Sequence, residues 1–466
     1  MSERSGERLK RAMQNLKADT AFRDRYANAA TLEDRMARTH TPALSIAVID
    51  DFKLAGVEAF GVHEAGVSDI AGKNSLFLAG SISKPVFATA IMLLVQQGVI
   101  DLDEDINEYL KSWKVPANNG WQPRITLRHI LSHTAGLTVH GFRGYLISEA
   151  IPTLPQILNG EQPANSPKVE VNIMPGVQFR YSGGGTTVAQ LAITEHLNES
   201  FPDVMKRLVF EPLGMNNSTF ENPLPADLHA MAAVAHPWKS VALKGKYPVY
   251  PEMAAAGLWT TAEDLAKFGI ALQKSLSGTD ASYLDKSTLE TMLSPQLAKD
   301  KEASDYDGLG FFCSGEGDAA VFEHGGWDEG FIADLTLYRS SGKGAVVMIN
   351  SNEGAPLVGE IVKAIAEEYD WPDSSKKKCA VKLSDLDIYA GNYESEQSLR
   401  INLEVTKGGL LLNYERQSSI FFEASSETSF FSGSLNTELN FKMNDDGAVT
   451  ALSLQQAGTQ IEAQKS

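Results

Sequence analysis

Short stretches of alternating hydrophobic residues lie near both ends of the main part of the chain. The segments 42–50 (PALSIAVID) and 56–62 (GVEAFGV) are β-branched and alternating, so we expect two strands joined as a hairpin. Two further strands are predicted within 331–352, on either side of a glycine-containing turn. Residues 83–97 (SKPVFATAIMLLVQQ) are almost entirely apolar, with a proline in the first turn and a glycine just beyond the run, which predicts a buried helix.

The remaining pattern predicts a helical insert and a second domain. From about 100 to 315, helical segments alternate with long loops that contain proline and glycine, and residues 355–371 again have a helical pattern. A polar, proline-led stretch at 372–382 is expected to be a linker. Short alternating stretches then recur at regular spacing over 383–466, which predicts a small β barrel or sandwich. We therefore expect one domain at 1–371 and another after the linker.

Composition and charge narrow the choice of partners. Of the 466 residues, 43% are hydrophobic and 21% charged, which is typical of a globular protein with more than one domain. The formal net charge of -18 disfavours nonspecific binding to phosphate backbones, so nucleic acid is not expected as a partner. No apolar run is long enough to predict a membrane span. The first twenty residues are charged and lack the apolar centre of a signal peptide, which predicts a cytoplasmic protein, although a chain whose leader had been removed would look the same.

A serine and a lysine three residues apart begin the buried helix. In Ser81-Ile-Ser-Lys84 the two side chains share one helical face, so the amine can reach the hydroxyl. A serine hydroxyl becomes a good nucleophile when a base removes its proton, and a partly desolvated lysine can assist. The motif alone is weak, because the same spacing recurs at Ser340, Ser374 and Ser375. Taken alone, the motif favours Ser81 as a helix N-cap, because serine is common at helix starts.

The surrounding sequence resembles a known family. The stretch LFLAGSISKPVFATAIMLLVQQGVIDLDEDINEYL is similar to the nucleophile region of the penicillin-recognising serine hydrolases, which include class C β-lactamases, DD-peptidases and related esterases of the family VIII type. Further similar blocks follow in the family's order: ITLRHILSHTAGL, PGVQFRYSGGG, EPLGMNNSTF, AAGLWTTAEDLAKF and HGGWDEG. Several blocks in one order are more specific than any single motif. The resemblance covers about residues 20–370 and implies that Ser81 forms the acyl-enzyme and that Lys84 assists it.

The family's second motif, Tyr-x-Asn, has two candidates. Tyr26 and Asn28 match it in full, but Tyr26 precedes the first strand and is expected to be a packing residue of the N-terminal helix. Tyr181 follows the nucleophile, as the resemblance requires, and is implied to exchange protons with Ser81 and the leaving group. Gly183 replaces the asparagine that binds an acylamino group in β-lactamases, which argues against efficient penicillin hydrolysis. The glycines at 183–185 are either a flexible helix entry or a widening of the site.

The third motif has the form His324-Gly325-Gly326, a variant of Lys-Thr-Gly that occurs in some peptidases and esterases of the family. By resemblance, the backbone amide of Trp327 joins that of Ser81 as an oxyanion hole. His324 is expected to hydrogen-bond either Tyr181 or a substrate carboxylate. Another basic residue before two glycines, Lys407, lies in the tail and is predicted to form a turn.

Other chemistry-bearing residues have structural explanations. His129 and His133 are spaced to share a helical face, as metal ligands do, but no carboxylate or cysteine accompanies them, and we expect structural roles. Trp259 and Phe179 either line an acyl pocket or pack in the core. The two cysteines, Cys313 and Cys379, do not suggest a disulfide framework. We expect no metal and no cofactor.

The sequence thus predicts an α+β fold, with an antiparallel sheet between helices as in β-lactamases, a helical insert and a barrel-like C-terminal domain. The tail beginning DLDIYAGNYES resembles the lipocalin-like domain of some family members, either as a lid or dimer contact or as a stabilising appendage. The expected activity is that of a serine hydrolase on small acyl esters. Alternatives are a peptidase or amidase for D-residues, a weak β-lactamase, or an inactive binding protein of the penicillin-binding type. The sequence leaves the oligomeric state open.

Overall fold

A computed structural model describes most of the chain. It covers residues 2–14, 16, 31–280, 282–297, 303, 305–372, 386–395, 400–406, 408–414, 419–432, 437–444, 446–456 and 459–466. Tyr26, Lys407 and Cys379 lie outside these residues, as does the expected linker apart from Pro372. The domain boundaries therefore stay predictions.

A seven-stranded antiparallel sheet forms the centre of the larger body. Its strands follow the order β2-β1-β9-β8-β7-β6-β5. Both hairpins expected from the sequence are present, β1 with β2 and β8 with β9. The strand bounds are β1 Ala43–Asp50, β2 Lys53–Gly61, β5 Tyr306–Asp307, β6 Phe312–Ser314, β7 Val321–Asp328, β8 Phe331–Tyr338 and β9 Gly344–Ile349.

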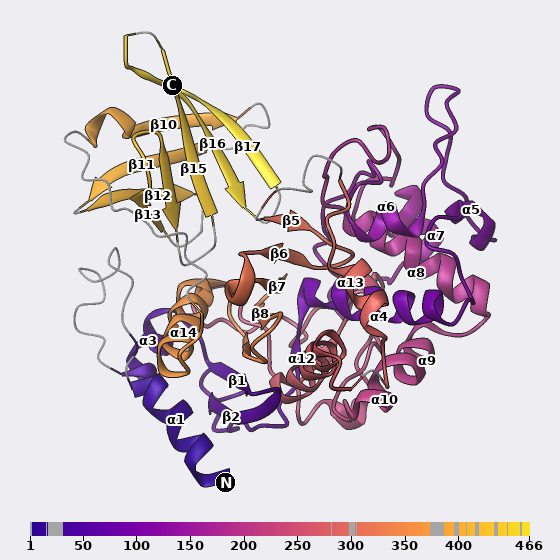
Figure 1. Cartoon of the computed structure of the whole chain (residues 1–466), viewed down its shortest axis with the longest axis horizontal. Helices are drawn as coiled ribbons and strands as arrows, with labels where there is room; N and C mark the ends of the chain where they lie inside the picture. Colours follow the sequence, from indigo (N-terminus) through magenta and orange to yellow (C-terminus); the bar gives the residue numbers. More distant parts are fainter. Residues whose placement is uncertain are drawn as a thin grey trace.

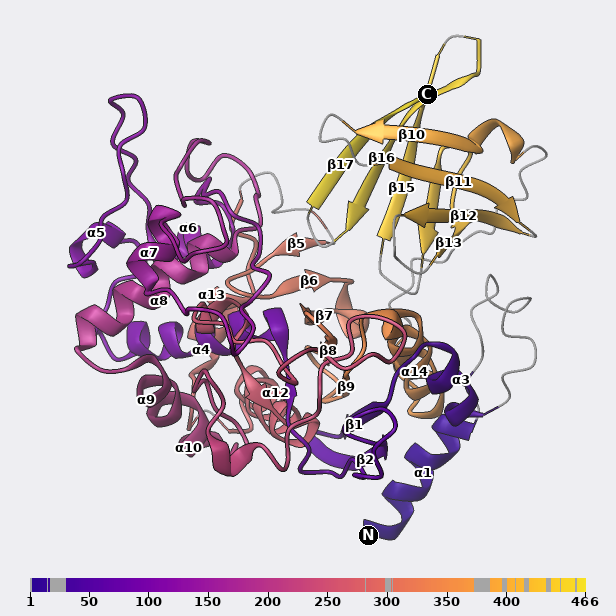
Figure 2. The same cartoon turned by 180° about the vertical axis from the view of Figure 1, so that it is seen from behind.

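Helices cover both faces of this sheet, as the alternation along β1 requires. Leu44, Ile46 and Val48 belong to the apolar cluster shared with α1 and α14, whereas Ala47 and Ile49 belong to the cluster on the opposite face, which includes α12. Figure 1 and Figure 2 show α1 and α14 together on one side and α12 with the insert on the other. The bounds are α1 Ser2–Gln14, α3 Leu32–Arg38, α12 Ala262–Ser277 and α14 Ala355–Glu368.

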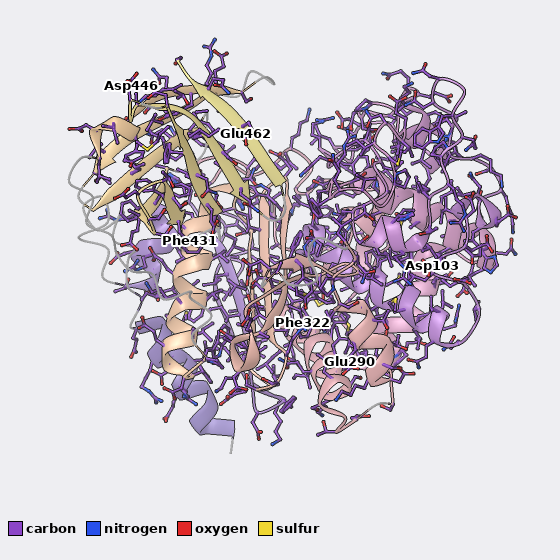
Figure 3. All side chains as sticks on the ribbon, turned by 45° about the horizontal axis from the view of Figure 1, so that its top comes forward. Asp103, Glu290, Phe322, Phe431, Asp446 and Glu462 are labelled. Carbon is purple, nitrogen blue, oxygen red and sulfur yellow. The ribbon has the colours of Figure 1, made fainter. Side chains whose placement is uncertain are left out.

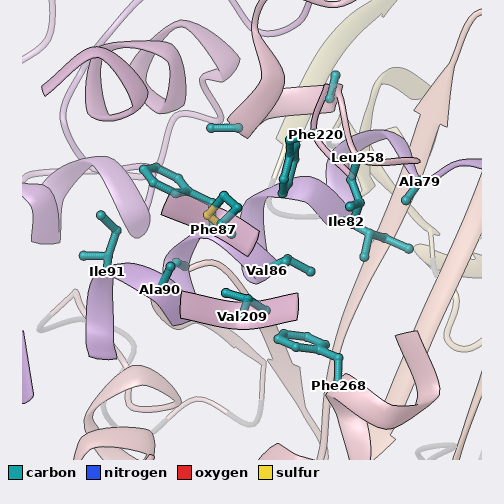
Figure 4. Packing of buried hydrophobic residues seen from close by; sticks show 14 of the residues in the cluster. Ala79, Ile82, Val86, Phe87, Ala90, Ile91, Val209, Phe220, Leu258 and Phe268 are labelled. Atoms are coloured by element: carbon teal, nitrogen blue, oxygen red, sulfur yellow. The ribbon is translucent and has the colours of Figure 1, made fainter. Parts of the chain in front are cut away.

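The helical insert packs around α4 (Ser83–Gln96), which is buried along most of its length. Figure 4 shows Val86 and Phe87 of α4 among apolar residues from distant segments, including Phe220 and Phe268. No helix among the described residues is long and apolar enough to cross a membrane. The other elements are β3 Phe77–Leu78, η1 Gly80–Ile82, α5 Ile106–Tyr109, α6 Leu127–Leu131, α7 Leu154–Asn159, α8 Gly183–Leu197, α9 Phe201–Met205, η2 Lys206–Phe210, α10 Glu211–Leu213, η3 Ala226–Leu228, α11 Met253–Ala256, β4 Trp259–Thr260, α13 Lys286–Met292, η5 Gly317–Ala319 and η6 Asn352–Gly354.

The C-terminal strands close into an antiparallel barrel, which decides between the two β architectures that the sequence allowed. Its interior is filled by side chains such as Tyr393, Phe430 and Phe441. Figures 1 and 2 show the barrel beyond β5 and β6, and in Figure 3 Phe431 and Glu462 mark the barrel while Phe322 marks β7. The elements are η7 Asp387–Tyr389, β10 Gly391–Ser395, β11 Arg400–Thr406, β12 Gly409–Tyr414, β13 Ile420–Ala424, β14 Ser429–Ser432, β15 Thr437–Met443, β16 Val449–Gln456 and β17 Thr459–Lys465.

Candidate active site

Ser81 and Lys84 meet at the junction between η1 and α4. The Lys84 side chain is buried, and its Nζ donates hydrogen bonds to Ser81 Oγ at 2.9 Å and to the Ala255 carbonyl at 2.7 Å. The second bond fixes the amine so that it faces the hydroxyl. The N-cap interpretation of Ser81 is wrong, because Ile82 precedes α4 and no side chain caps the helix.

Two glycines let the Ser81 turn approach the edge of strand β7. Gly80 has a φ of 53°, and a Cβ there would lie 2.6 Å from the Trp327 nitrogen. A Cβ on Gly326 would lie 1.9 Å from the Ala79 carbonyl oxygen. Only glycine permits this contact, which brings the Trp327 amide beside the turn that carries Ser81. The Trp327 indole itself is 46% exposed.

A second serine, Ser83, stabilises the same turn by hydrogen bonds to the backbone. It is fully buried, donates to the Gly80 carbonyl at 2.6 Å and accepts the Leu258 N–H at 3.0 Å. Its hydroxyl is therefore committed to holding the backbone. No role for Ser83 was predicted from the sequence, although its position directly before Lys84 at the start of the helix was an available signal.

Tyr181 lies beside the lysine, immediately before α8. The Lys84 Nζ is 4.9 Å from the centroid of the Tyr181 ring, so the amine faces the ring. The ring packs between His133, at a centroid distance of 4.2 Å, and His140, at 4.8 Å. Ser182 caps α8 by accepting the Gly185 N–H, and this fixes the backbone next to Tyr181.

His133 and His140 are site residues that the sequence analysis did not assign. The expectation that His129 and His133 share a helical face is wrong, because α6 ends at Leu131 and His133 has a φ of 55°. The His133 Nδ1 accepts the Ser182 N–H at 3.2 Å, which ties the loop after α6 to the Tyr181 segment. His133 could have been found from the sequence, because it lies inside a block that resembles the family. No such sequence feature indicated His140.

His324 is present at the site, but not in the expected role. Its Nδ1 donates to the Gly325 carbonyl at 2.6 Å, and its Nε2 has no hydrogen-bond partner among the described residues. The ring lies 6.4 Å from that of Tyr181 and stacks on Phe312, so the expected His324–Tyr181 hydrogen bond is not formed. Burial and the charge of Lys84 lower the His324 pKa to about 3. The imidazole is therefore neutral near pH 7, and because its one N–H is donated to Gly325, it has none left to donate to a substrate carboxylate.

The same causes keep the neighbouring imidazoles uncharged. Burial, followed by the charge of Lys84, lowers the pKa of both His133 and His140 below the ordinary histidine value. Lys84 is thus surrounded by neutral rings. Within the described part of the chain, no three histidine, cysteine, aspartate or glutamate side chains come together as metal ligands would.

The glycines that begin α8 are closely packed, and Gly184 leaves no room for a Cβ. A Cβ on Gly183 would meet the His140 carbonyl at 3.1 Å and the Phe142 ring at 3.2 Å, and one on Gly184 would meet the Thr138 carbonyl at 2.8 Å. The His140 carbonyl and the Phe142 ring therefore border the position from which the family's asparagine side chain would extend. Close packing, rather than a flexible entry or a widened site, accounts for Gly184.

The two aromatic candidates for an acyl pocket differ. Trp259 is fully buried in the core between Tyr247 and Phe331, so its pocket role is wrong. The Phe179 ring packs 5.8 Å from that of His133 and so borders the Tyr181 cluster.

A family model described as Beta-lactamase matches residues 28–369. The chain belongs to the β-lactamase family. A second model, described as a domain of unknown function (DUF3471), matches residues 375–465. Membership of this family makes the chain a serine hydrolase. The contact between Ser81 and Lys84 agrees with this assignment.

Named relatives of this β-lactamase family chain include both penicillin-binding proteins and an esterase. Penicillin-binding protein 4* of Bacillus subtilis (strain 168) is 24% identical over 86% of this chain and 91% of its own length. Esterase EstB of Burkholderia gladioli is 25% identical over 33% of this chain and 40% of its own length. Among solved structures, an octameric penicillin-binding protein homologue from Pyrococcus abyssi has a TM-score of 0.59 and 18% identity, over 92% of this chain and 98% of that one. The similarity to this solved structure supports the fold of the chain alone.

Proposed function

We propose that this chain hydrolyses short acyl esters through an acyl-enzyme on Ser81. The observation that carries the proposal is the hydrogen bond of 2.9 Å between Lys84 Nζ and Ser81 Oγ, held in place by the Ala255 carbonyl. A serine with a fixed amine at its oxygen is the arrangement that nucleophilic catalysis uses. The esterase among the relatives adds support.

The proton of Ser81 can pass along a relay of two residues. As Oγ attacks the ester carbonyl carbon, the Lys84 amine in its neutral form takes the hydroxyl proton. Tyr181 lies against the same amine and can pass that proton to the departing alkoxide. Water then attacks the acyl carbon and gives a proton to the relay. The relay returns this proton to Oγ as the bond between the acyl carbon and Oγ breaks, which releases the carboxylic acid and regenerates Ser81.

The negative charge that develops on the carbonyl oxygen requires donors that are already in place. The amides of Ser81 and Trp327 are the proposed pair, because Gly80 and Gly326 let their backbones approach closely. Such preorganised donors commonly contribute about 10²- to 10³-fold each to kcat. The mechanism assigns no proton transfer to His324, whose Nδ1–H is engaged with Gly325.

The surroundings of Tyr181 favour a simple ester over a β-lactam. Gly183, beside the Phe142 ring, stands where the family has its acylamino-binding amide, and His324 replaces a lysine without carrying a charge near pH 7. A hydrogen bond to a charged group is worth roughly 1.5 to 3 kcal/mol, so the loss of both anchors costs a β-lactam several powers of ten in kcat/KM. A short acyl ester does not use either anchor.

A peptidase or amidase for D-residues is the second candidate, and weak β-lactamase activity the third. The long match to a penicillin-binding protein favours these two over an unrelated chemistry. An inactive binding protein is the non-enzymatic alternative. The intact contact between Ser81 and Lys84 argues against it.

One panel of substrates distinguishes these candidates. We expect kcat/KM for p-nitrophenyl butyrate to exceed that for nitrocefin by at least about 100-fold, with a D-alanyl p-nitroanilide between them. Ser81→Ala, assayed on the same panel, measures background hydrolysis. A nitrocefin rate equal to the ester rate would replace the esterase with a β-lactamase, a dominant D-alanyl rate would replace it with a peptidase, and no turnover of any substrate would favour the binding protein.

A further inference from the structure

A buried glutamine in the middle of α8 reaches across to the start of the short helix α11. Gln190 is 2% exposed, and both ends of its side-chain amide are hydrogen-bonded to backbone groups. Its Nε2 donates to the Pro251 carbonyl at 3.1 Å, and its Oε1 accepts the Ala254 N–H at 2.9 Å. One side chain thus joins two helices that lie far apart in the sequence.

The start of α11 depends on this bridge. The backbone carbonyl of Glu252 accepts the N–H groups of Ala255 and Ala256, but no side chain within this segment caps the helix. The Ala254 N–H belongs to the first turn of α11, where an N–H group has no carbonyl of its own helix to reach. Gln190 supplies the missing acceptor from α8.

The position of α11 matters because this helix anchors the catalytic amine. The Lys84 Nζ donates to the Ala255 carbonyl at 2.7 Å and to Ser81 Oγ at 2.9 Å. The first contact fixes the direction of the amine, so a displaced carbonyl would turn the amine away from the hydroxyl. A misplacement of about 1 Å in a catalytic site can cost roughly 100-fold in rate.

The same glutamine relates this anchor to Tyr181. Tyr181 directly precedes Ser182, the N-cap of α8, so a single helix carries Tyr181 at its start and Gln190 at its centre. The Lys84 Nζ lies 4.9 Å from the centroid of the Tyr181 ring. That separation depends on how α8 is held against α11, which is what the two hydrogen bonds of Gln190 determine.

We propose that Gln190 is a positioning residue for the proton relay, because it bridges α8 to the start of α11 and thereby fixes the carbonyl that holds the Lys84 amine. This inference rests on the function proposed above. Both ends of the Gln190 amide are engaged with the backbone, so the residue takes part in no proton transfer. It acts through Lys84, and its loss should therefore lower kcat and leave KM unchanged.

The first test measures Gln190→Met and Gln190→Glu on p-nitrophenyl butyrate. Methionine is of similar length but has no N–H to donate and only a weak acceptor, so we expect kcat to fall at least about tenfold while KM stays within about twofold. Glutamic acid keeps both hydrogen bonds when it is protonated, and burial favours that form. At pH 6 the kcat of Gln190→Glu should therefore stay within about threefold of the wild type at the same pH.

A double-variant cycle separates positioning from a general loosening of the fold. In a Lys84→Ala protein the amine is already absent, so adding Gln190→Met should lower kcat by less than about twofold. A role in folding alone would lower kcat by the same factor in both backgrounds. If Gln190→Met does not fold, Gln190→Asn, which keeps the amide on a side chain one carbon shorter, takes its place in the cycle.

The matched control is Gln273→Met, which removes a similar bridge elsewhere in the domain. Gln273 of α12 is fully buried, and its Nε2 donates to the carbonyls of Tyr338 and Lys343 at 2.9 and 2.7 Å. Tyr338 pairs with Val321, at the end of β7 opposite to Trp327. We expect the kcat of Gln273→Met to be unchanged, with unfolding temperatures recorded for all variants to account for stability.

Four results would each overturn the proposal. They are an unchanged kcat in Gln190→Met, an equal loss in the Lys84→Ala background, a loss that appears in KM, and a folded Gln190→Glu that is as slow as Gln190→Met at pH 6. If Ser81→Ala keeps wild-type turnover, the proposed function fails instead.

Discussion

The two halves of the site are built in different ways. On the nucleophile side, Lys84 and Ser83 are hydrogen-bonded to buried backbone groups, and the Lys84 amine donates to Ser81. On the recognition side, Tyr181 packs against the rings of His133 and His140. Gly183, beside the Phe142 ring, and an uncharged His324 stand where the family has polar anchors.

This difference separates chemistry from specificity. Bond breaking requires the nucleophile, a proton acceptor and oxyanion donors, and these are held by a rigid core around α4. Substrate choice depends on side chains from the loop before α8, which can change without disturbing that core. Variants on the two sides should therefore differ in which kinetic constant they alter and by how much.

The largest effect is expected from Ser81→Ala. Removal of the attacking oxygen should lower ester turnover to background, a loss of at least about 10⁴-fold, and abolish labelling by a fluorophosphonate. The unfolding temperature should stay within a few degrees, since the only side-chain hydrogen bond of Ser81 to another described residue is the one with Lys84. Mass spectrometry of the labelled wild type should locate the adduct on Ser81.

The chain offers an internal contrast for this labelling. The His63 ring bridges Ser75 Oγ, at 2.6 Å, and the Asp69 carboxylate, at 2.9 Å, in an arrangement like that of a catalytic triad. Ser75 is buried, however, and its Oγ accepts the Gly72 N–H, so it is placed to brace a loop. An adduct on Ser75 or Ser83, or undiminished turnover in Ser81→Ala, would contradict the assignment.

The second-largest loss of kcat is expected from variants of the proton relay. Lys84→Ala and Tyr181→Phe should each lower kcat by about 100-fold or more, the usual scale for a positioned proton-transfer group. The double variant should be little worse than the poorer single variant, because groups that act as one unit are not additive. Steady-state kinetics on p-nitrophenyl butyrate measures this, and fully multiplicative losses would mean that the two residues act separately.

Much of the fold could be predicted from the spacing of hydrophobic residues and from the turn residues. The alternation in β1, β2, β8 and β9 and the apolar run in α4 were sufficient, because burial on known faces fixes those patterns. The serine and lysine of the nucleophile turn were also predictable, since a helix places residues three apart on one face.

The recognition half was harder to predict, for a physical reason. His133, His140 and Phe142 reach the site along a loop with no period, and His133 does so through a positive φ that its residue type rarely adopts. The neutral state of His324 and the burial of Gln190 depend on what packs around them in three dimensions, which single-sequence patterns do not encode.

A third variant tests the recognition half directly. Gly183→Asn restores the family's asparagine, but its Cβ would press on the His140 carbonyl and the Phe142 ring. We expect ester kcat/KM to fall about tenfold, no gain with nitrocefin, and a loss of about 1 to 3 kcal/mol in unfolding free energy. Denaturant titration and the substrate panel measure both.

Two controls separate crowding from chemistry. Gly214→Asn places the same residue after the C-terminus of α10, where the backbone has the αL conformation that asparagine also adopts. A Cβ there meets nothing within 4 Å, so stability should change little. Adding Phe142→Ala to Gly183→Asn makes room for the new side chain and should restore part of the lost stability. A nitrocefin rate that rises in Gly183→Asn alone would show that the asparagine fits and that Phe142 yields.

The smallest effect concerns stability against pH and the buried Glu252. Its pKa is raised by burial from an ordinary 4.5 to about 8, so the folded protein holds a proton that the unfolded chain releases between these values. This contribution to stability is fully present below pH 4.5 and is lost as the pH rises towards 8. Glu252→Gln cannot titrate, so between pH 5 and pH 8.5 the wild type should lose a few kcal/mol more unfolding free energy than the variant does.

Asp334 provides the comparison that assigns this pH dependence to Glu252. Burial raises the Asp334 pKa from 3.8 to about 6, so Asp334→Asn should flatten only the part of the curve below about pH 6.5. The dependence between pH 6.5 and pH 8.5 should persist in Asp334→Asn and be smaller in Glu252→Gln. Urea titrations of the three proteins at pH 5, 6.5 and 8.5 measure it. If Glu252→Gln keeps the wild-type slope above pH 6.5, then Glu252 is already ionised in the folded protein, and a buried negative charge, rather than a neutral acid, lies behind the helix that anchors Lys84.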